Sequence, residues 1–537
     1  PNPDQPSDLH VHCSNRRCDF SGRKGKNLPI VTVDEPIYRR LPCFLIATVD
    51  KFASLPWVGE TGALFGKVDR YDQDGFYGPT QPGRGRALGS QLPPPDLIIQ
   101  DELHLISGPL GTMVGLYETA IDALCSREIN GKPTRPKIVA STATVRRASK
   151  QIQALFGRSE VDIFPPPGPD RRDSFFAKTV PASEKNARTY VGIAAQGRSA
   201  KVVLLPTYLA LLGAAQKHWL AAGGKKNPEN PADPYMTLLG YFNSLRELGG
   251  SRRIVEDEVK TRLNRYSQRK GIGETSGLFA DRKIDDEPEE LTSRVSTSEV
   301  ANTKQRLEST FNKDDKIDVV LATNMISVGL DITRLGLMVV LGQPKTAAEY
   351  IQATSRVGRD EKRPGLVVTL LNIHRPRDRS HYERFCAWHS SFYRAVEATS
   401  VTPFSPRAID RGIAAITVAL ARLGHTKMTA PINAIEILQN RQELEFVVDK
   451  IAQRAEMHDK ELSASDSEAL RQKVRNTVKD LLDLWERIAN DKINLQYQRE
   501  VGEAPPLIFE PLDPEILNQP LEARKFKAQR SLRDVEP

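Results

Sequence analysis

The chain is poor in the features that mark secreted or membrane-bound proteins. It has five cysteines in 537 residues, too few and too scattered for a disulfide framework, and this usage favours a reducing cytoplasm. No uninterrupted apolar run is long enough to span a bilayer, and no signal peptide opens the chain at Pro1. These absences exclude a disulfide-stapled secreted domain and predict a cytoplasmic protein with no membrane partner.

The charge balance is only mildly basic. Lys and Arg number 76 against 68 Asp and Glu, for a formal net charge of +8. A positive balance suits a polyanionic partner such as nucleic acid, although over this length it is a weak bias. At ~150 residues per domain, the length predicts about three domains.

Short apolar runs followed by turns or helices predict two α/β layers with parallel sheets. The expected strands of the first layer are 44–47, 97–99 and 137–140, and those of the second are 237–242, 318–322, 337–341 and 365–371. After about Arg375 the pattern becomes helical. Ser405 before Pro406 predicts one helix start, ended by Gly424, and Ser465 to Glu468 is a capping-box pattern that predicts another.

An apolar strand that ends in two carboxylates is the first sign of nucleotide chemistry. Asp101 and Glu102 directly follow the run at 97–99. One carboxylate there can hold Mg²⁺, and the other can orient an attacking water. His104 completes Asp-Glu-Leu-His, and Thr142-Ala143-Thr144 follows a later apolar strand. A surface turn would explain the first motif alone, but not two strand-end motifs in this order.

A second group of motifs lies far downstream. Gln352, Arg356 and Arg359 are spaced at about one helical turn, so on a helix their side chains would share a face. Arginine suits multidentate contact with phosphate oxygens, so the pair can stabilise charge that develops on a transferred phosphoryl group.

The run at 322–332 (ATNMISVGLDI) precedes these arginines. Gly329 permits a close backbone approach, and Thr323 can donate to a phosphate. Asp331 can accept from a ribose or from one of the arginines. A buried strand and turn without a ligand is the alternative for this run.

In chain order, these patterns resemble the motifs of superfamily 2 helicases and translocases. The matching stretches are 47–52 (motif Ib), 101–104 (motif II), 142–144 (motif III), 241–246 (motif IV), 291–294 (the short element after it), 322–332 (motif V) and 352–359 (motif VI). For 47–52, an ordinary strand-to-helix cap by Thr48 or Asp50 is the alternative.

The resemblance implies ATP and Mg²⁺ as cofactors, with Mg²⁺ on Asp101 and water activated by Glu102. It implies further nucleotide contacts from Gly329, Asp331, Arg356 and Arg359. It also implies that His104, Thr142, Thr144 and Gln352 couple hydrolysis to DNA grip. The nucleic-acid contacts that it implies are Thr48, Lys51, Thr144, Asn243, Ser244, Arg246, Thr292, Arg294 and Thr323. Such contacts would be made mainly to the backbone, and therefore would tolerate any sequence and depend on salt.

Four stretches resemble one branch in particular, the helicase-like subunit of the bacterial DISARM anti-phage system. They are 37–42 (IYRRLP), 47–57, 243–250 (NSLRELGG) and 397–406 (EATSVTPFSP). This resemblance covers most of residues 37–415 and implies a DNA-binding ATPase, acting on single-stranded DNA or a single-stranded end, with a partner subunit that contains a DUF1998 domain.

The expected fold is therefore α/β, with two RecA-like lobes (parallel sheets flanked by helices) and a helical C-terminal region. The expected divisions are an irregular segment at 1–36, a first lobe at 37–190, a second lobe at 191–375 and helices at 376–537. ATP would bind between the lobes, and DNA would cross both.

One motif is missing. A phosphate-cradling Gly-x-x-x-x-Gly-Lys-Ser/Thr should precede 47–52, but 22–27 (GRKGKN) has the wrong spacing and no Ser/Thr after its lysine. Either that loop lies upstream of Pro1 in a longer protein, or the ATPase is degenerate. A DNA-repair helicase of the same superfamily and a non-catalytic DNA-binding scaffold therefore stay open as alternatives.

Three segments outside these motifs carry weaker hypotheses. Cys13 and Cys18, near His10 and His12, form at most a zinc half-site, so zinc is not expected. The helices from Ser405 onward dock a partner or pack against the second lobe. The Gly- and Pro-rich stretch 66–95 regulates access to DNA or is a surface excursion. Its side chains that could stack on bases or pair with phosphates are Tyr71, Phe76, Tyr77, Arg84 and Arg86. Trp388, Phe392 and Tyr393 are expected in a core.

Overall fold

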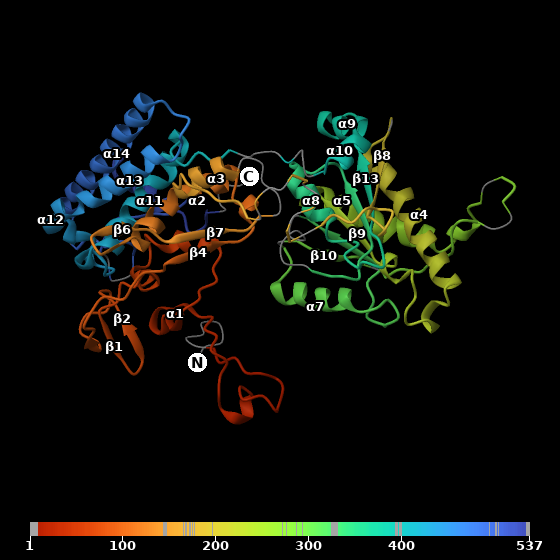
Figure 1. The fold of residues 1–537 in the computed structure, drawn as a ribbon, viewed down its shortest axis with the longest axis horizontal. Helices are drawn as coiled ribbons and strands as arrows, with labels where there is room; N and C mark the ends of the chain where they lie inside the picture. Colours follow the sequence, from red (N-terminus) through yellow and green to blue (C-terminus); the bar gives the residue numbers. More distant parts are fainter. Residues whose placement is uncertain are drawn as a thin grey trace. The chain divides into compact units, whose positions relative to one another are not determined.

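The computed structural model describes residues 9–142, 148–164, 166, 169–170, 173, 175–176, 178–195, 197–270, 272–274, 277–285, 287–292, 294–323, 331–392, 396, 400–492, 494–499, 502 and 504–532. The chain forms two compact units (Figure 1), one built from Pro1–Asp162 with Ala398–Pro537 and the other from Ile163–Glu397. The predicted α/β class with a helical C-terminal region is confirmed.

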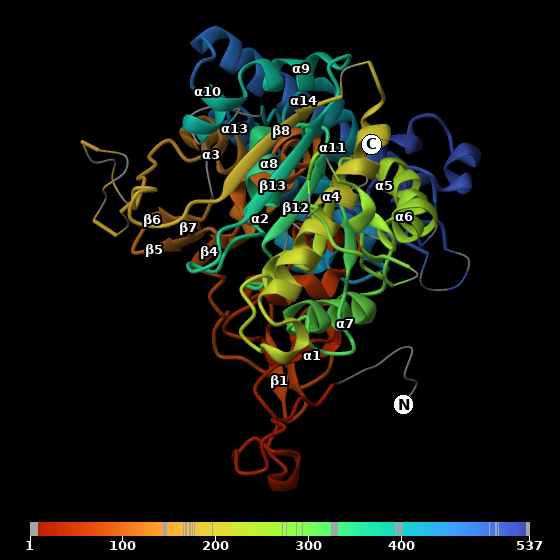
Figure 2. The same cartoon turned by 90° about the vertical axis from the view of Figure 1, so that its right-hand side faces the viewer.

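The second unit is built on a six-stranded sheet in the order β10-β11-β9-β12-β13-β8, in which every neighbouring pair is parallel. Figure 2 shows β8, β13 and β12 side by side in it. Its elements are β8 (Thr189–Ala194), α4 (Ala200–Ala221), β9 (Leu238–Phe242), α5 (Leu245–Arg253), α6 (Lys260–Leu263), β10 (Glu289–Leu291), α7 (Thr297–Glu308), β11 (Val319–Ala322), β12 (Leu337–Leu341), α8 (Ala347–Thr354), β13 (Leu366–Leu371), α9 (Pro376–Glu383) and α10 (Phe385–Ser390).

The strands of this sheet are apolar because both faces are buried. Successive side chains alternate, so Leu238 and Phe242 of β9 join the core under α4 and α5, whereas Leu239 and Tyr241 join the core under α7 and α8. Trp388 and Phe392 pack against this second core, as predicted, and Tyr393 lies outside the described residues. The expected strands of this layer are confirmed, and β8 and β10 add two that the apolar pattern did not predict.

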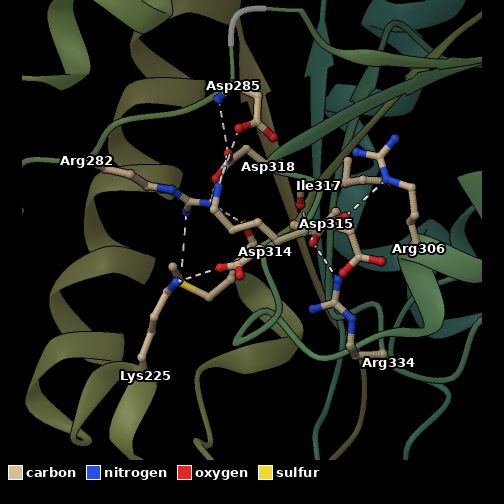
Figure 3. Close-up of polar contacts among 12 residues, drawn as sticks. Lys225, Arg282, Asp285, Arg306, Asp314, Asp315, Ile317, Asp318 and Arg334 are labelled. Atoms are coloured by element: carbon tan, nitrogen blue, oxygen red, sulfur yellow. Dashed lines mark hydrogen bonds and ion pairs between the residues drawn. The ribbon is translucent and has the colours of Figure 1, made fainter.

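A buried ionic network closes the amino edge of the sheet (Figure 3). Arg282 is 3% exposed and donates through Nη2 to Asp318 Oδ1 at 2.6 Å, directly before β11. Burial lowers the pKa of Arg282, and the carboxylate of Asp318 opposes this shift. Arg334 pairs with Asp233 at 3.2 Å beside the start of β9. Ligands of parallel sheets bind at the carboxyl ends of the strands, so this network is structural.

The acidic composition of 281–290 would suggest a solvated loop, but the stretch is only partly exposed. The segment carries the buried Arg282, the start of β10 and Asp285, whose pKa is raised by burial and by the nearby Asp318. Its acidic composition reflects ion pairing within the unit.

The first unit combines a short parallel pair, β4 with β7, with a layer of helices. Figure 1 shows α2 and α11 beside each other, and α13 packs along α14. Its elements are α1 (Asp34–Arg40), β1 (Arg70–Asp72), β2 (Gly75–Tyr77), β3 (Arg86–Ala87), β4 (Leu97–Gln100), α2 (Gly108–Cys125), β5 (Arg127–Ile129), β6 (Lys132–Thr134), β7 (Lys137–Ala140), α3 (Ala148–Phe156), α11 (Pro406–Gly424), α12 (Ile437–Asn440), α13 (Glu445–Met457) and α14 (Ala464–Asp491).

Three local expectations in this unit are wrong. Residues 44–47 form no strand, and Ile46 is 85% exposed. The Gly and Pro content of 66–95 would suggest a stretch without regular structure, yet β2-β1-β3 form a small antiparallel sheet in it. Its Tyr77 is buried under the Arg39 guanidinium, 4.3 Å from the ring centroid, and so does not face solvent for base stacking. The helix expected from Ser465 begins earlier, with Ser463 accepting from the Asp466 N–H at 3.1 Å.

The C-terminal helices share one core with the first unit. Arg422 of α11 is 1% exposed and donates through Nη1 to the carbonyls of Pro56 and Trp57, at 3.1 and 2.6 Å. Arg454 of α13 donates to the carbonyls of Ala154 and Leu155 at the end of α3, at 2.8 and 2.7 Å. Burial lowers the pKa of Arg454 to about 10. The expectation that these helices pack against the second lobe is corrected, since they complete the first.

Candidate functional site

The carboxyl ends of β4 and β7 bring the first two motifs into contact. Asp101 follows β4, and its Oδ1 accepts the Glu102 N–H at 2.9 Å and the hydroxyl of Ser141, which follows β7. The Leu103 N–H donates to the Ser141 carbonyl at 2.9 Å. Because the strands are parallel neighbours, the two loops end at the same sheet edge. Among the described residues, Asp101 Oδ2 has no hydrogen-bond partner, and Asp101 as a whole is exposed.

His104 links the same two loops a second time. Its side chain is 6% exposed, and Nδ1 lies 3.4 Å from both Thr142 Oγ1 and Glu102 Oε2. Glu102 itself is 45% exposed at the side chain and has φ of 50°, a left-handed backbone conformation that is uncommon outside glycine. The turn therefore holds the Glu102 carboxylate at the edge of the sheet, between Asp101 and a nearly buried imidazole.

Sequence reasoning missed the residue that supports this turn. Gln151 of α3 is buried, and its Nε2 donates to the carbonyls of Leu103 and Ile106, at 3.2 and 2.8 Å. The only local signal is a glutamine on the inner face of a helix with a clear apolar side.

We expect Gln151→Leu to loosen the turn without unfolding the unit. Two hydrogen bonds are lost at about 0.5–1.5 kcal/mol each, so amide exchange at Leu105 and Ile106 should accelerate roughly tenfold. Hydrogen exchange with mass spectrometry measures this change. Gln153→Leu is the matched control, since Gln153 lies on the same helix and donates to Met457 instead. Equal exchange in the two variants would rule out the supporting role.

The second-unit motif with two arginines does not lie on one helix as expected. Helix α8 ends at Thr354, so Gln352 is on the helix and buried, whereas Arg356 and Arg359 follow in the turn after it. Gly358 lies in this turn, with φ of 68° and its N–H donating to the Leu335 carbonyl at 2.7 Å. A Cβ there would lie 2.3 Å from the Gly365 nitrogen.

Asp331 accepts from Arg359 Nη1, which is one of the two contacts predicted for it. Arg359 also donates through Nε to the Ser355 carbonyl at 3.2 Å. Both charged groups keep part of their surface exposed, at 64% for Asp331 and 30% for Arg359. The pair therefore fixes the guanidinium while leaving part of it accessible.

The residues of the predicted motif IV lie at the carboxyl end of β9. Asn243 donates through Nδ2 to the Leu341 carbonyl at 3.0 Å and so ties β9 to β12. Ser244 caps α5 by accepting the Glu247 N–H at 3.3 Å. Ser244 and Arg246 line a pocket of about 380 Å³.

The other predicted nucleic-acid contacts differ in accessibility. Thr292 is fully buried and donates to Glu290 Oε1 at 2.6 Å, and Arg294 pairs with the same carboxylate at 2.8 Å. Thr323 is also buried at the end of β11.

In the first unit, Thr48 is exposed and Lys51 pairs with Asp34 at 2.5 Å. Burial would lower the pKa of Lys51, but Asp34 and Tyr38 outweigh it, and the pKa is raised. Thr144 and Gly329 lie outside the described residues. Contact of these residues with nucleic acid stays a prediction.

No group of three or more His, Cys, Asp or Glu within the described part of the chain could hold a metal ion, and there Cys13 and Cys18 are both free thiols. The helices described in the structure include none that is long and apolar enough to cross a membrane.

Comparison with known proteins finds relatives of this chain. Residues 282–361 match the family model described as the helicase conserved C-terminal domain. The chain is 41% identical over 503 residues to the DISARM protein DrmA of Bacillus paralicheniformis, an alignment that covers 91% of this chain and 42% of that protein. The chain resembles DrmA. The predicted resemblance is confirmed, and the chain spans about two fifths of the length of this relative.

Solved structures show weaker similarity. The DUF1998 helicase MrfA bound to DNA has a TM-score of 0.39 at 15% identity, with 70% of this chain and 38% of that chain covered. The helicase Lhr of Mycobacterium smegmatis, bound to ssDNA and AMP-PNP, has a TM-score of 0.39 at 16% identity, with the same coverage of the two chains.

Proposed function

We propose that the chain is part of an ATP-dependent DNA helicase or translocase of superfamily 2 that acts in bacterial anti-phage defence. The 41% identity to a DISARM protein across 91% of the chain supports the biological role. The helicase C-terminal match at 282–361 supports the enzyme class. The proposed setting is the bacterial cytoplasm, with a DUF1998-containing partner subunit.

The contact between the loops after β4 and β7 carries the proposal. Ser141 donates to Asp101, and Thr142 lies beside His104, so a movement of one loop would displace the other. A strand-end carboxylate pair that is linked in this way to the next loop can couple nucleotide chemistry to a change in DNA grip. A surface turn without a function would not require the nearly buried imidazole of His104. It would also not require the loops after β4 and β7 to meet at one edge of the sheet.

The donor set fits Mg²⁺ with ATP. Asp101 is an exposed residue that accepts two hydrogen bonds through Oδ1 and none through Oδ2 within the described residues, and a carboxylate oxygen is the ligand that Mg²⁺ favours. Asp101 would hold Mg²⁺, which would supply positive charge next to the phosphates of ATP. Glu102 would orient and deprotonate the attacking water. Arg356 and Arg359 would stabilise the charge on the transferred group, with Asp331 holding Arg359 in position.

We propose that a separate segment supplies the missing phosphate-cradling loop. The β4–β7 pair packs on the core through Ile98 and Ile138, but Leu97, Ile99 and Val139 on its opposite face are 49%, 55% and 47% exposed. Parallel sheets are normally covered on both faces. A strand and helix that carry the loop would cover this face and bring the loop to the edge where Asp101 lies.

We expect the protein to contact the sugar-phosphate backbone of DNA, on single strands or at single-stranded ends. The test is ATP hydrolysis by the full-length protein with increasing single-stranded DNA at several salt concentrations. We expect DNA to stimulate hydrolysis and the stimulation to fall steeply with salt. A non-catalytic scaffold predicts binding with no more hydrolysis than Asp101→Asn. A repair helicase predicts that Asp101→Asn sensitises cells to DNA damage and leaves phage protection intact, the reverse of the result we expect.

A further inference from the structure

The pocket of about 380 Å³ lies entirely within the second unit, at the carboxyl edge of its sheet. Its walls come from four segments of the chain: the start of α4, the start of α5, the turn after β12 and the turn after β13. The basic side chains among its lining residues are Lys201, Arg246 and Arg375. Only Arg246 belongs to the predicted motif IV.

The positive charge in this pocket is not balanced by the protein. Within the described residues, neither Lys201 nor Arg246 has an ion-pair partner. Arg375 pairs with Glu247 at 3.0 Å, and the second oxygen of Glu247 has no hydrogen-bond partner. The other acid, Asp378, is 1% exposed and accepts the Gln343 and Asn372 N–H groups, each at 3.0 Å. Two unpaired cations in one hollow favour an anionic ligand.

The backbone adds to this preference. Ser199 and Ser244, the residues before α4 and α5, both line the pocket, so two helix N-termini lie at its wall. Gly250 of α5 makes room for Lys201, because a Cβ there would lie 2.3 Å from Lys201 Nζ. The ammonium group is therefore seated against α5, on the side of the pocket where Arg246 stands.

We propose that this pocket binds one phosphodiester of the DNA strand, with Lys201 and Arg375 as contact residues that the helicase motifs do not include. The inference rests on the proposed function and adds the start of α4 and the turn after β13 to the DNA path. Glu247 acts as a positioning residue that holds Arg375 at the pocket.

The experiment measures binding of the full-length protein to labelled single-stranded DNA over a range of salt. We expect Lys201→Gln with Arg375→Gln to weaken binding roughly tenfold and to reduce the slope of log K against log salt by about 0.7, the value for one phosphate on a single strand. Arg377→Gln is the matched control, an exposed arginine two residues from Arg375 that does not line the pocket. Gly250→Ala should give a smaller loss, since it displaces the Lys201 ammonium without removing charge.

Failure of this inference and failure of the proposed function give different results. If the wild-type protein shows no salt-dependent binding to single-stranded DNA, the proposed function fails. If the wild type binds but the double variant has the affinity and slope of Arg377→Gln, only the pocket inference is overturned. A third measurement tests whether inorganic phosphate competes with the labelled DNA for binding. If the double variant loses phosphate competition but keeps DNA affinity, the site takes a free phosphate and the DNA contact is wrong.

Discussion

Glu102→Gln is expected to abolish DNA-stimulated ATP hydrolysis, by more than about 100-fold, while ATP still binds. The amide keeps the shape of the side chain but cannot take a proton from water. Its neighbours should stay in place, because Asp101 is held through Oδ1 by the backbone and by Ser141 and not by the Glu102 side chain. Steady-state phosphate release measures turnover, and a fluorescent ATP analogue measures binding.

Glu128→Gln is the control for this substitution. Glu128 is an exposed carboxylate on β5 of the same unit, away from the β4 and β7 loops. It should leave hydrolysis unchanged. Near-normal turnover in Glu102→Gln would remove Glu102 from the catalytic role. Loss of both binding and turnover would point to a structural defect of the turn, which hydrogen exchange at Leu105 and Ile106 would detect.

Arg422→Met should destabilise the first unit by about 3–5 kcal/mol. Three carbonyls lose their donor, those of Pro56, Trp57 and Thr429, and a buried acceptor left without a partner costs about 1–3 kcal/mol. The contact of the guanidinium with the Tyr497 ring, at 4.2 Å, is lost as well. Urea titration followed by hydrogen exchange resolves the two units, so peptides from α2 and α11 should open at lower urea while those from β9 and β12 do not change.

Arg411→Met is the matched control for this change. Arg411 lies on the same helix but is exposed, so its loss should shift the unfolding of the first unit by less than about 0.5 kcal/mol. If the two variants unfold alike, the C-terminal helices are not part of the first core. The same contacts predict that removing the residues after Gly424 opens this core, because α13 and α14 supply much of it.

The strands of the second unit and the chemistry at the strand ends could be read from the sequence. A strand buried on both faces must be apolar throughout, so β9, β11, β12 and β13 stand out as runs. The two carboxylates after β4 and the paired arginines are also visible, since a strand end followed by charge is a local pattern. The resemblance to superfamily 2 helicases then assigned these patterns to known motifs, because they occur in the same order along the chain.

Other features were decided by contacts between distant segments. Arg356 and Arg359 lie beyond the end of α8, in a turn where Gly358 approaches Gly365, and the spacing of the arginines alone does not reveal that approach. The strand β10 (Glu-Glu-Leu) is polar in sequence and forms because β11 offers it an edge. Residues 44–47 are apolar but remain outside any sheet.

The buried arginines show most clearly which features could not be predicted from the sequence. Arginine is usually a surface residue, but Arg282, Arg422 and Arg454 are buried, and carbonyls or carboxylates from elsewhere in each unit accept hydrogen bonds from their guanidinium groups. Gln151 is buried in the same way, with the carbonyls of Leu103 and Ile106 accepting from it. Lys201 and Arg375 stay exposed, and the fold brings them to one pocket. The sequence alone determined which apolar runs form strands and which charges follow them. The tertiary structure decided which polar groups are buried or brought together, because that depends on partners far away along the chain.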